Sequence, residues 1–398
     1  MTAINRRLFL AAGAGLTVMN ASSNETINVG VIGTGGRGTF VMGAFQKNAN
    51  VRVTSVCDVY ETNLAAAQAS VQKTSGHAPR AFHDYGELLA SRDVDAVLIT
   101  TPEHWHHRMV LDALAAGKDV YVEKPLCHTP EQGVELVKAE KASKQIIQVG
   151  MQRRSYDLFL NAREVVRAGH LGEVRMVRSW WLNNYLNDKP QPLEGKLDWD
   201  AWQGPAPKRP FALDRFRNWR YYSDYAGGIV ADQGAHVFDG IHMLMNAGAP
   251  YEVNASAGKI HRPGVDMPES VTACAKYKED FLAVFSINYA AMHYRPENDQ
   301  LNQFDGNRAR LDIGRTKFKV YDLGKEDDPV LQDQSERGFS YATDLHVANF
   351  LDCVRTRKVT TAPISLGFQS SLVVQLVNIS LKHGRSVRWN ADESRVEV

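Results

Sequence analysis

The sequence predicts an α/β protein of two domains, a parallel sheet first and a mainly antiparallel sheet second. Its 398 residues are enough for two domains and a sizeable core. Strand-like and helical patterns alternate as far as residue 150, which favours a parallel sheet with right-handed crossovers. Beyond residue 151, strand patterns follow one another directly, and Glu279-Asp280 provides a hairpin turn between two of them.

The first domain is expected over residues 27–150. Its strands are short apolar runs, and its helices show apolar residues at helical spacing. Thr129-Pro130-Glu131-Gln132 gives one helix start, with Thr as N-cap, Pro at the first position and Gln at the third. The predicted strands are 27–33, 51–58, 96–100, 119–123 and 146–150, and the predicted helices are 37–48, 61–73, 104–116 and one that begins after Thr129.

The second domain, residues 151–398, is predicted to be α+β with an open, mainly antiparallel sheet that serves substrate binding and oligomerisation. An irregular aromatic stretch covers residues 182–225. The edges of such an open sheet favour pairing, so a homodimer or homotetramer is expected. The predicted strands are 174–181, 252–260, 271–278 and 281–289, and the predicted helices are 229–245, 344–355 and 366–382.

Composition excludes several classes of protein. Hydrophobic residues make up 44% and charged residues 23%, as in globular proteins. A formal net charge of +1 argues against a nucleic-acid partner. No metal site is expected, because the cysteines form no CxxC pair and because His106, in the cluster of His104, His106 and His107, is accounted for as a cleft residue. The four cysteines are expected to be buried free thiols: Cys57, Cys127, Cys274 and Cys353.

Residues 1–26 are predicted to be a twin-arginine signal and linker. Arg6-Arg7 precedes an apolar run over residues 8–19, and small residues follow at 21–23. The run is too short to span a bilayer and fits a signal core. The expected location is therefore periplasmic or at the cell surface. Met19 suits the cleavage site poorly, so an uncleaved signal would anchor the protein, and no other membrane segment is expected.

A glycine-rich turn follows the first predicted strand. Gly33-Thr34-Gly35-Gly36-Arg37-Gly38 matches GxGxxG, opens a helix, and is followed by Asp58 at the end of the second strand. Glycines there permit a tight turn and close approach to a pyrophosphate, and the helix N-terminus attracts its charge. This pattern predicts a Rossmann domain. Asp58 suits the two ribose hydroxyls and repels a 2′-phosphate, which predicts NAD rather than NADP.

Three further segments carry candidate chemistry. Thr101-Pro102-Glu103-His104-Trp105-His106 and Glu123-Lys124-Pro125 follow the ends of two parallel strands, where ligands bind in such sheets. Gly227 and Gly228 leave room for a flat ring before a helix begins. Asp232 and His236 then share one face of that helix, where an imidazole suits proton transfer.

Taken in order, these segments resemble the Gfo/Idh/MocA family of oxidoreductases, which includes glucose–fructose oxidoreductase and inositol dehydrogenase. The resemblance covers nearly all of residues 27–390. The matching segments are the glycine-rich turn 33–38, Asp58, residues 101–106, residues 123–125 and residues 227–236. Residues 199–205 and 346–350 look like the exported branch of the family.

The resemblance implies an NAD-dependent oxidoreductase of a sugar or polyol. His236 would accept the hydroxyl proton, Lys124 would stabilise the developing alkoxide, and Asp232 would orient the substrate or the imidazole. Besides the glycine-rich turn and Asp58, the cofactor contacts would be Thr101, Pro102, His106, Glu123 and Lys124. Cleft residues for the substrate would be Gln152, Arg153, Tyr185, Trp202 and Trp219, together with Trp181, because aromatic faces suit sugar rings.

Two other functions stay open. Some members of the family are glycosidases that keep NAD bound and oxidise the substrate transiently, which export for glycan degradation would fit. A binding or sensing protein with a relic nucleotide fold is the third reading, against which the complete set of Lys124, Asp232 and His236 argues.

Overall fold

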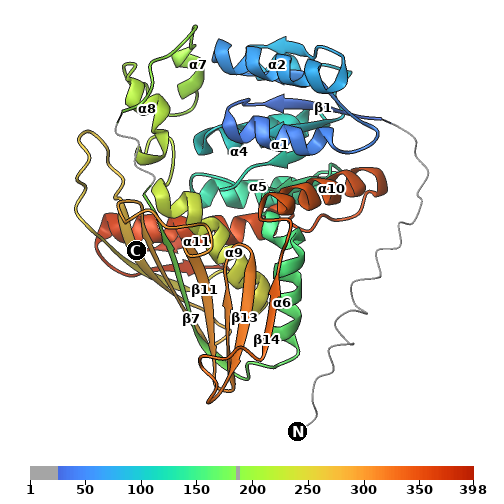
Figure 1. The fold of residues 1–398 in the computed structure, drawn as a ribbon. Coiled ribbons are helices and arrows are strands. Elements are labelled where there is room, and N and C mark those ends of the chain that lie inside the picture. Colours follow the sequence, from blue (N-terminus) through green and yellow to red (C-terminus); the bar gives the residue numbers. More distant parts are fainter. Residues whose placement is uncertain (1–25, 185–188) are drawn as a thin grey trace.

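A computed structural model describes residues 26–184 and 189–398 of the chain. The predicted signal, apart from residue 26, and Tyr185 lie outside these described residues. The fold has two sheets, one above the other in Figure 1, with helices between them. The predicted fold class is confirmed.

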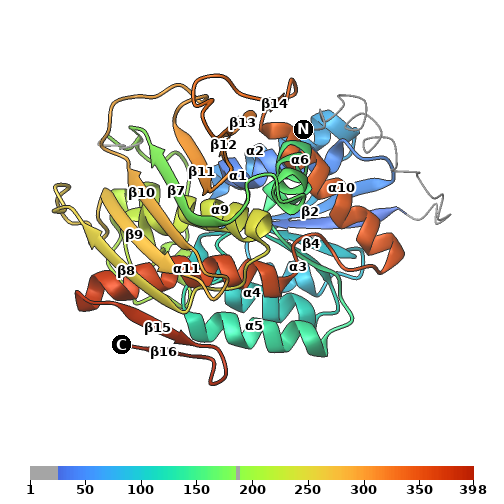
Figure 2. The ribbon, with the colours of Figure 1, turned by 90° about the horizontal axis from the view of Figure 1, so that it is seen from below.

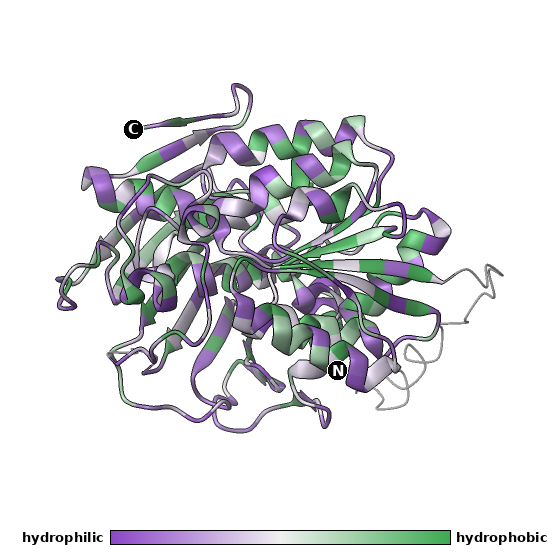
Figure 3. Ribbon diagram, turned by 90° about the horizontal axis from the view of Figure 1, so that it is seen from above, coloured by the Kyte–Doolittle hydropathy of each residue, from purple (hydrophilic) through white to green (hydrophobic). Residues whose placement is uncertain are grey.

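The first sheet is parallel throughout, with the strand order β3-β2-β1-β4-β5-β6. Every residue of β4 and β5 is buried, because helices cover both faces of the sheet. Figure 3 shows these strands as a hydrophobic layer. The strands are β1 (Ile27–Ile32), β2 (Val51–Cys57), β3 (Arg80–Phe82), β4 (Ala96–Ile99), β5 (Asp119–Val122) and β6 (Ile147–Val149).

The helices of this domain begin where the sequence pattern predicts. At the fifth helix the hydroxyl of Thr129 accepts from the N–H of Gln132, whose side chain reaches back to the cap, so the predicted capping box is present. The short strand β3 and helix α3 were not predicted. The helices are α1 (Gly36–Gln46), α2 (Glu61–Ser75), α3 (Tyr85–Leu89), α4 (Glu103–Ala115) and α5 (Pro130–Ala142).

The second sheet has ten strands in the order β14-β13-β12-β11-β7-β10-β9-β8-β15-β16. β7 and β10 run parallel, and the other neighbouring strands that the structure describes run antiparallel. The strands are β7 (Val174–Leu182), β8 (Glu252–Ala257), β9 (Ser270–Lys276), β10 (Leu282–Asn288), β11 (Gln300–Gly306), β12 (Ala309–Ile313), β13 (Lys317–Asp322), β14 (Leu331–Gln334), β15 (Val387–Asn390) and β16 (Arg395–Glu397).

One face of this sheet packs on helices and the other faces outward. On β10, Ala283, Phe285 and Ile287 are buried, whereas the residues between them are half-buried. Figures 1 and 2 show α9 and α11 lying against the sheet on the side of the first domain. The longer helices of this half are α6 (Asp157–Arg167), α9 (Gly228–Met245), α10 (Ser340–Thr356) and α11 (Ile364–His383).

Helix α11 is the one helix of the described chain that is long and apolar enough to cross a membrane. We expected no membrane segment beyond the signal, and by length and composition α11 contradicts that expectation. Two thirds of its apolar window is buried, and it contacts α9, α5 and β8 inside the fold. Its hydrophobicity is accounted for by its position between the two sheets.

Helix α10 lies in the second half of the chain but packs on the first domain. Its buried Phe350 lies edge-on against Phe45 of α1 and Tyr121 of β5, with ring centroids 5.9 Å apart in each case. Lys47 and Asp344 form an ion pair beside this contact, at 2.8 Å. The two halves of the chain thus share a core.

Strands β11 to β14 were missed by the sequence analysis. The reason is visible in β11, where the buried positions include Gln300 and Asn302 beside Phe304. Polar residues on the inward face conceal the alternation that predicts a strand. Two short helices, α7 (Trp199–Gln203) and α8 (Leu213–Arg217), also lie in the stretch that was predicted to be irregular.

Candidate active site

A cavity of about 740 Å³ lies beside the glycine-rich turn. Gly33 has φ +84°, a backbone conformation that favours glycine, and a Cβ on Gly38 would lie 2.1 Å from the oxygen of Gly33. In front of Gly36, by contrast, a Cβ would meet nothing within 4 Å. The N-cap of α1 is Gly35, which offers no side chain to the free N–H groups. An open surface with unpaired N–H groups fits a pyrophosphate.

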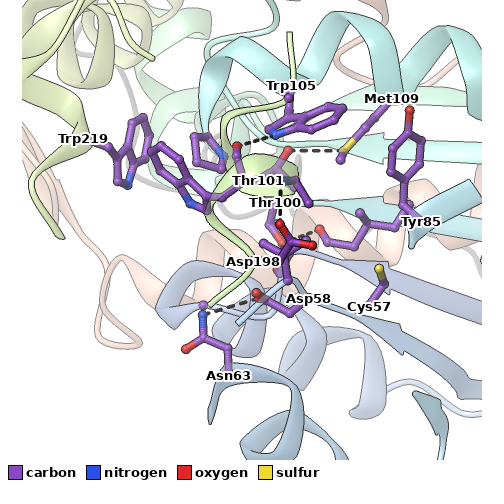
Figure 4. A pocket seen from close by; sticks show the side chains of 18 of the residues that line it. Cys57, Asp58, Asn63, Tyr85, Thr100, Thr101, Trp105, Met109, Asp198 and Trp219 are labelled. Carbon is purple, nitrogen blue, oxygen red and sulfur yellow. Dashed lines mark hydrogen bonds between the residues drawn. The ribbon is translucent and has the colours of Figure 1, made fainter. Parts of the chain in front are cut away.

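Asp58 lies at the end of β2, in the wall of the same cavity. Its Oδ2 accepts from the backbone N–H of Thr34 at 2.7 Å, and its Oδ1 accepts from that of Tyr60 at 2.9 Å. Burial raises the pKa of Asp58, and these hydrogen bonds oppose the rise. Figure 4 shows Asp58 and Asn63 toward one end of the cavity and the rings of Trp105 and Trp219 away from them. From this position Asp58 could hold the ribose of a bound nucleotide.

Residues 194–220, which we call the strap, form another part of the wall of this cavity. They belong to the second domain and carry α7 and α8, which lie beside the first domain in Figure 1. Near the ribose end, the N–H of Glu61 donates to the oxygen of Lys196 and that of Asp198 donates to the oxygen of Val59, each at 3.0 Å. At the other end, Trp105 Nε1 donates to the oxygen of Trp202 at 2.8 Å. The strap is therefore fastened at both ends of the cavity.

A second cavity of about 410 Å³ holds the predicted catalytic group. It shares Thr100, Thr101, Arg37, Trp219 and Arg220 with the larger cavity, so the two adjoin. Lys124 comes from the loop after β5, whereas Asp232 and His236 come from α9 of the second domain. All three line this second cavity.

Lys124 and Asp232 form an ion pair across the two domains. The ammonium donates to Oδ1 and to the backbone oxygen of Asp232, at 2.7 Å each, and both side chains are about one tenth exposed. The other oxygen of Asp232 lies 3.2 Å from Nε of Arg220 and accepts from Gln233 at 3.1 Å. Burial alone would raise the pKa of Asp232, but the charges of Arg220 and Lys124 hold it well below its ordinary value. This carboxylate is therefore ionised.

His236 lies one turn beyond Asp232 on α9, with 7% of its surface exposed. Burial lowers its pKa well below the ordinary value, and the positive charges of Lys124 and Arg153 lower it further. Its Nδ1 is buried and accepts or donates no hydrogen bond within the part of the chain that the structure describes. A neutral imidazole at this place can accept a proton.

The remaining predicted cofactor residues hold the junction of the cavities together. The Arg37 guanidinium donates to Glu123 Oε1 through two nitrogens, at 2.9 and 2.8 Å. The two ring nitrogens of His106 lie 2.7 Å from the oxygen of Pro125 and 2.8 Å from that of Thr101. His106 therefore links the loops after β4 and β5, and Pro102 lines the larger cavity.

The predicted substrate residues are not all at the second cavity. Gln152, Trp181 and Trp219 line it, whereas Trp202 lines the larger cavity and stacks on Trp199, with centroids 4.8 Å apart. Arg153 is 2% exposed and lies behind the cavity, where it donates to the backbone oxygen of His236 at 3.2 Å. Trp202 and Arg153, which were predicted to contact the substrate, therefore do not line the second cavity.

Several lining residues were missed by the sequence analysis. Arg220 and Gln233 contact Asp232, and Phe339 and Arg315 also line the second cavity. Arg315 is paired with Asp299 through two nitrogens, at 2.9 and 2.6 Å. Gln233 lies within residues 227–236, a segment that the sequence analysis identified, so it could have been proposed as a cavity residue. Arg315 and Phe339 follow strands that were not predicted, so no sequence pattern pointed to them.

These features define a class: a protein with a Rossmann dinucleotide-binding domain whose nucleotide cavity adjoins a second, polar cavity between domains. Two family models match the chain. One, described as an oxidoreductase family with an NAD-binding Rossmann fold, matches residues 27–151, and the GFO/IDH/MocA C-terminal domain matches residues 159–312. The chain belongs to the Gfo/Idh/MocA family of oxidoreductases, and its first domain is an NAD-binding domain.

Curated relatives carry two kinds of name. A glycosyl hydrolase family 109 protein of Solibacter usitatus (strain Ellin6076) is 34% identical over 208 residues, 48% of this chain and 47% of that protein. An inositol 2-dehydrogenase/D-chiro-inositol 3-dehydrogenase of Shouchella clausii (strain KSM-K16) is 38% identical over 155 residues, 38% of this chain and 44% of that protein. The chain matches less than half the length of each.

Solved structures share the fold over almost the whole chain. An NAD-binding oxidoreductase from Klebsiella pneumoniae has a TM-score of 0.73 at 20% identity, covering 91% of this chain and 99% of that one. Levoglucosan dehydrogenase in complex with NADH and L-sorbose has a TM-score of 0.72 at 18% identity, covering 92% and 99%. At these identities the likeness establishes the fold.

Proposed function

We propose that this protein is an NAD-dependent oxidoreductase that oxidises a hydroxyl-bearing carbon of a sugar or polyol. The observation that carries the proposal is the junction of the two cavities, where Lys124, Asp232 and His236 from two domains line the space next to the nucleotide cavity. NAD supplies the hydride acceptor when it is bound. The protein supplies binding, orientation and proton transfer.

Each of the three groups has one role in this proposal. His236, which is neutral, accepts the proton of the substrate hydroxyl. Lys124 donates a hydrogen bond to the same oxygen and stabilises its developing negative charge. Asp232 stays ionised beside Lys124 and Arg220, and holds the ammonium in place. The charge and position of the three groups support these roles.

The charges around the second cavity favour a neutral polar substrate. Each cation that lines it lies beside a carboxylate: Arg37 pairs with Glu123, and Arg315 pairs with Asp299. Lys124 and Arg220 share Asp232. Trp181, Trp219 and Phe339 add aromatic faces, against which a sugar ring can pack.

Replacing Lys124 tests the proposal. Lys124→Ala should reduce kcat at least about a hundredfold, because the alkoxide loses its electrostatic partner. NAD affinity should change little, as measured by fluorescence titration. Turnover would be followed as NADH absorbance with a panel of hexoses, inositols and glycosides. Lys141→Ala, at an exposed position on α5, is the matched control. Near-normal turnover by Lys124→Ala would refute the assignment.

A second candidate is an NAD-dependent glycosidase, favoured by the match to the family 109 glycosyl hydrolase protein. In that reaction the substrate carbon is oxidised, the glycosidic bond is eliminated, and the hydride returns after water adds. Release of nitrophenol from a nitrophenyl glycoside without net NADH would identify this activity. Accumulation of NADH in step with substrate consumed would identify the dehydrogenase.

We further propose that the protein is exported by the twin-arginine route and forms a homodimer or homotetramer. The first part is supported by Arg6-Arg7 and the apolar run after it. The second is supported by the outward face of the large sheet, on which residues such as Val284 are only half-buried. Cell fractionation and light scattering test these two proposals.

A further inference from the structure

Glu103 is a buried carboxylate that the mechanism above does not use. It is the first residue of α4, immediately after Thr101-Pro102, and only 2% of its surface is exposed. It lines the second cavity together with Lys124 and Asp232. Its Oε1 is buried and makes no hydrogen bond to any described residue.

The other oxygen of Glu103 reaches the helix that carries the candidate catalytic residues. Oε2 accepts from the backbone N–H of Gly227 at 2.9 Å, and Gly227 is the N-cap of α9. On the opposite side, the oxygen of Gly227 accepts from Asn378 of α11 at 2.8 Å. The start of α9 is thus held between the first domain and α11.

Helix α9 lacks a cap of its own. Gly227 has no side chain, and the first turn contains no acidic residue. The N–H groups at a helix start are unpaired and carry partial positive charge, so a carboxylate there is stabilising. A side chain at position 227 is excluded, because a Cβ would lie 2.6 Å from that of Ala231 and 2.8 Å from Nδ2 of Asn378. Glu103 provides the carboxylate from the other domain.

We propose that Glu103 is a positioning residue: its carboxylate caps α9 across the domain boundary and so holds Asp232 and His236 in register with Lys124. Asp232 is the fifth residue of this helix and His236 lies one turn further. A shift of the helix start therefore moves both groups relative to the first domain. The inference rests on the proposed function for its effect on turnover, but the capping contact itself does not depend on it.

The strength of this cap should depend on pH, because Glu103 can be ionised or protonated. Burial raises the pKa of Glu103 to about 7, and Asp232 of α9 adds to the rise. The hydrogen bond from Gly227, Lys124 after β5 and Arg220 of the strap oppose it, and the thiol of Cys127 nearby is protonated. A carboxylate is a stronger acceptor than a carboxylic acid. The cap should therefore weaken as pH falls through 7.

This limb of the pH profile is separate from that of the proposed base. The pKa of His236 lies well below its ordinary value because of burial and the charge of Lys124. Loss of the neutral imidazole should therefore appear at lower pH. We therefore expect kcat to fall as pH decreases through 7, and we attribute this fall to protonation of Glu103.

Glu103→Gln tests the proposal, since the amide keeps the size and an acceptor oxygen but cannot ionise. Its kcat at pH 8 should fall at least about threefold, the lower end of what a helix cap contributes, and the limb near pH 7 should be absent. Glu103→Asp should retain a pH-dependent limb. Glu87→Gln, at an exposed acid of the same domain, is the control and should match the wild type.

Hydrogen exchange at the start of α9 supplies a readout that needs no substrate. Amides of residues 228–231 should exchange faster in Glu103→Gln than in the wild type, and a cooperative melting transition confirms that the variant is folded. Unchanged exchange would overturn the cap. Faster exchange with a wild-type pH profile of kcat would overturn the link to catalysis. If the wild type oxidises no tested sugar, the proposed function fails, and the exchange result still decides whether Glu103 caps α9.

Discussion

Asp232 receives Lys124 from the first domain and Arg220 from the strap, so two positive charges meet one carboxylate at the domain boundary. Burial keeps His236 neutral, and the charges of Lys124 and Arg153 add to this effect. The charge of Lys124 lowers the pKa of both groups, which favours the ionised form of Asp232 and the neutral form of His236. A neutral imidazole has a free lone pair, which a general base needs in order to accept a proton.

Asp58 allows a test of cofactor selection. In Asp58→Asn the side chain keeps its size and an acceptor for the N–H of Thr34 but loses its charge. The preference for NAD over NADP should fall about tenfold or more, because hydrogen bonds to a charged group contribute about 1.5–3 kcal/mol and repulsion of the 2′-phosphate is lost. Dissociation constants of both nucleotides measure it. An unchanged ratio of the two dissociation constants would show that the ribose does not bind at Asp58.

At the scale of elements, the strap connects the second domain to the ribose end of the nucleotide cavity. Tyr60 is part of this connection: its hydroxyl accepts from the N–H of Glu194 at 3.0 Å, and its ring lies edge-on against Phe216 at 5.5 Å. Because the strap lines the cavity, its fastening should influence how fast the nucleotide leaves.

Tyr60→Phe should speed NAD dissociation about two- to tenfold, since one hydrogen bond contributes about 0.5–1.5 kcal/mol and the ring contact remains. Stopped-flow displacement of NAD measures the rate. Tyr121→Phe is a matched control, because the Tyr121 hydroxyl is buried without a hydrogen-bond partner among the described residues and its ring packs on Phe45 and Phe350. Equal rates for the two variants would show that this fastening does not govern release.

At the scale of the whole molecule, α10 makes the first domain dependent on the second half of the chain. Phe350 is fully buried among residues of the first domain, in a core that also includes Phe45 and Tyr121. The first domain is therefore completed by residues that follow it by more than 180 positions in the sequence.

Phe350→Ala should lower the free energy of unfolding by about 3–5 kcal/mol, the usual effect of removing a buried aromatic ring. Chemical denaturation followed by circular dichroism measures it. Val359→Ala, at a residue that is 81% exposed near the end of the same helix, should change stability by less than about 0.5 kcal/mol. Similar values for the two variants would contradict the shared core.

The features that the sequence predicted correctly are those that depend on residues close together in the chain. The glycine-rich turn, the capping box at Thr129 and the alternation of strands and helices each depend on neighbours in sequence, and the structure contains all three. Lys124, Asp232 and His236 were recognisable because each lies in a segment with its own pattern. Arg315 and Phe339 lie in segments without one, and Gln300 and Asn302 concealed a strand by being polar and buried.

The sequence by itself determined the two types of sheet and the glycine-rich turn, because these follow from periodicity and short-range backbone geometry. The residues of the candidate catalytic group were indicated by the resemblance to the family. Only the tertiary structure decided that Arg220 pairs with Asp232, that Glu103 caps α9, and that Arg153 lies behind His236. Each of these contacts joins residues separated along the chain, and its geometry is set by how helices pack between the two sheets. Such packing depends on the whole chain at once and leaves no local pattern.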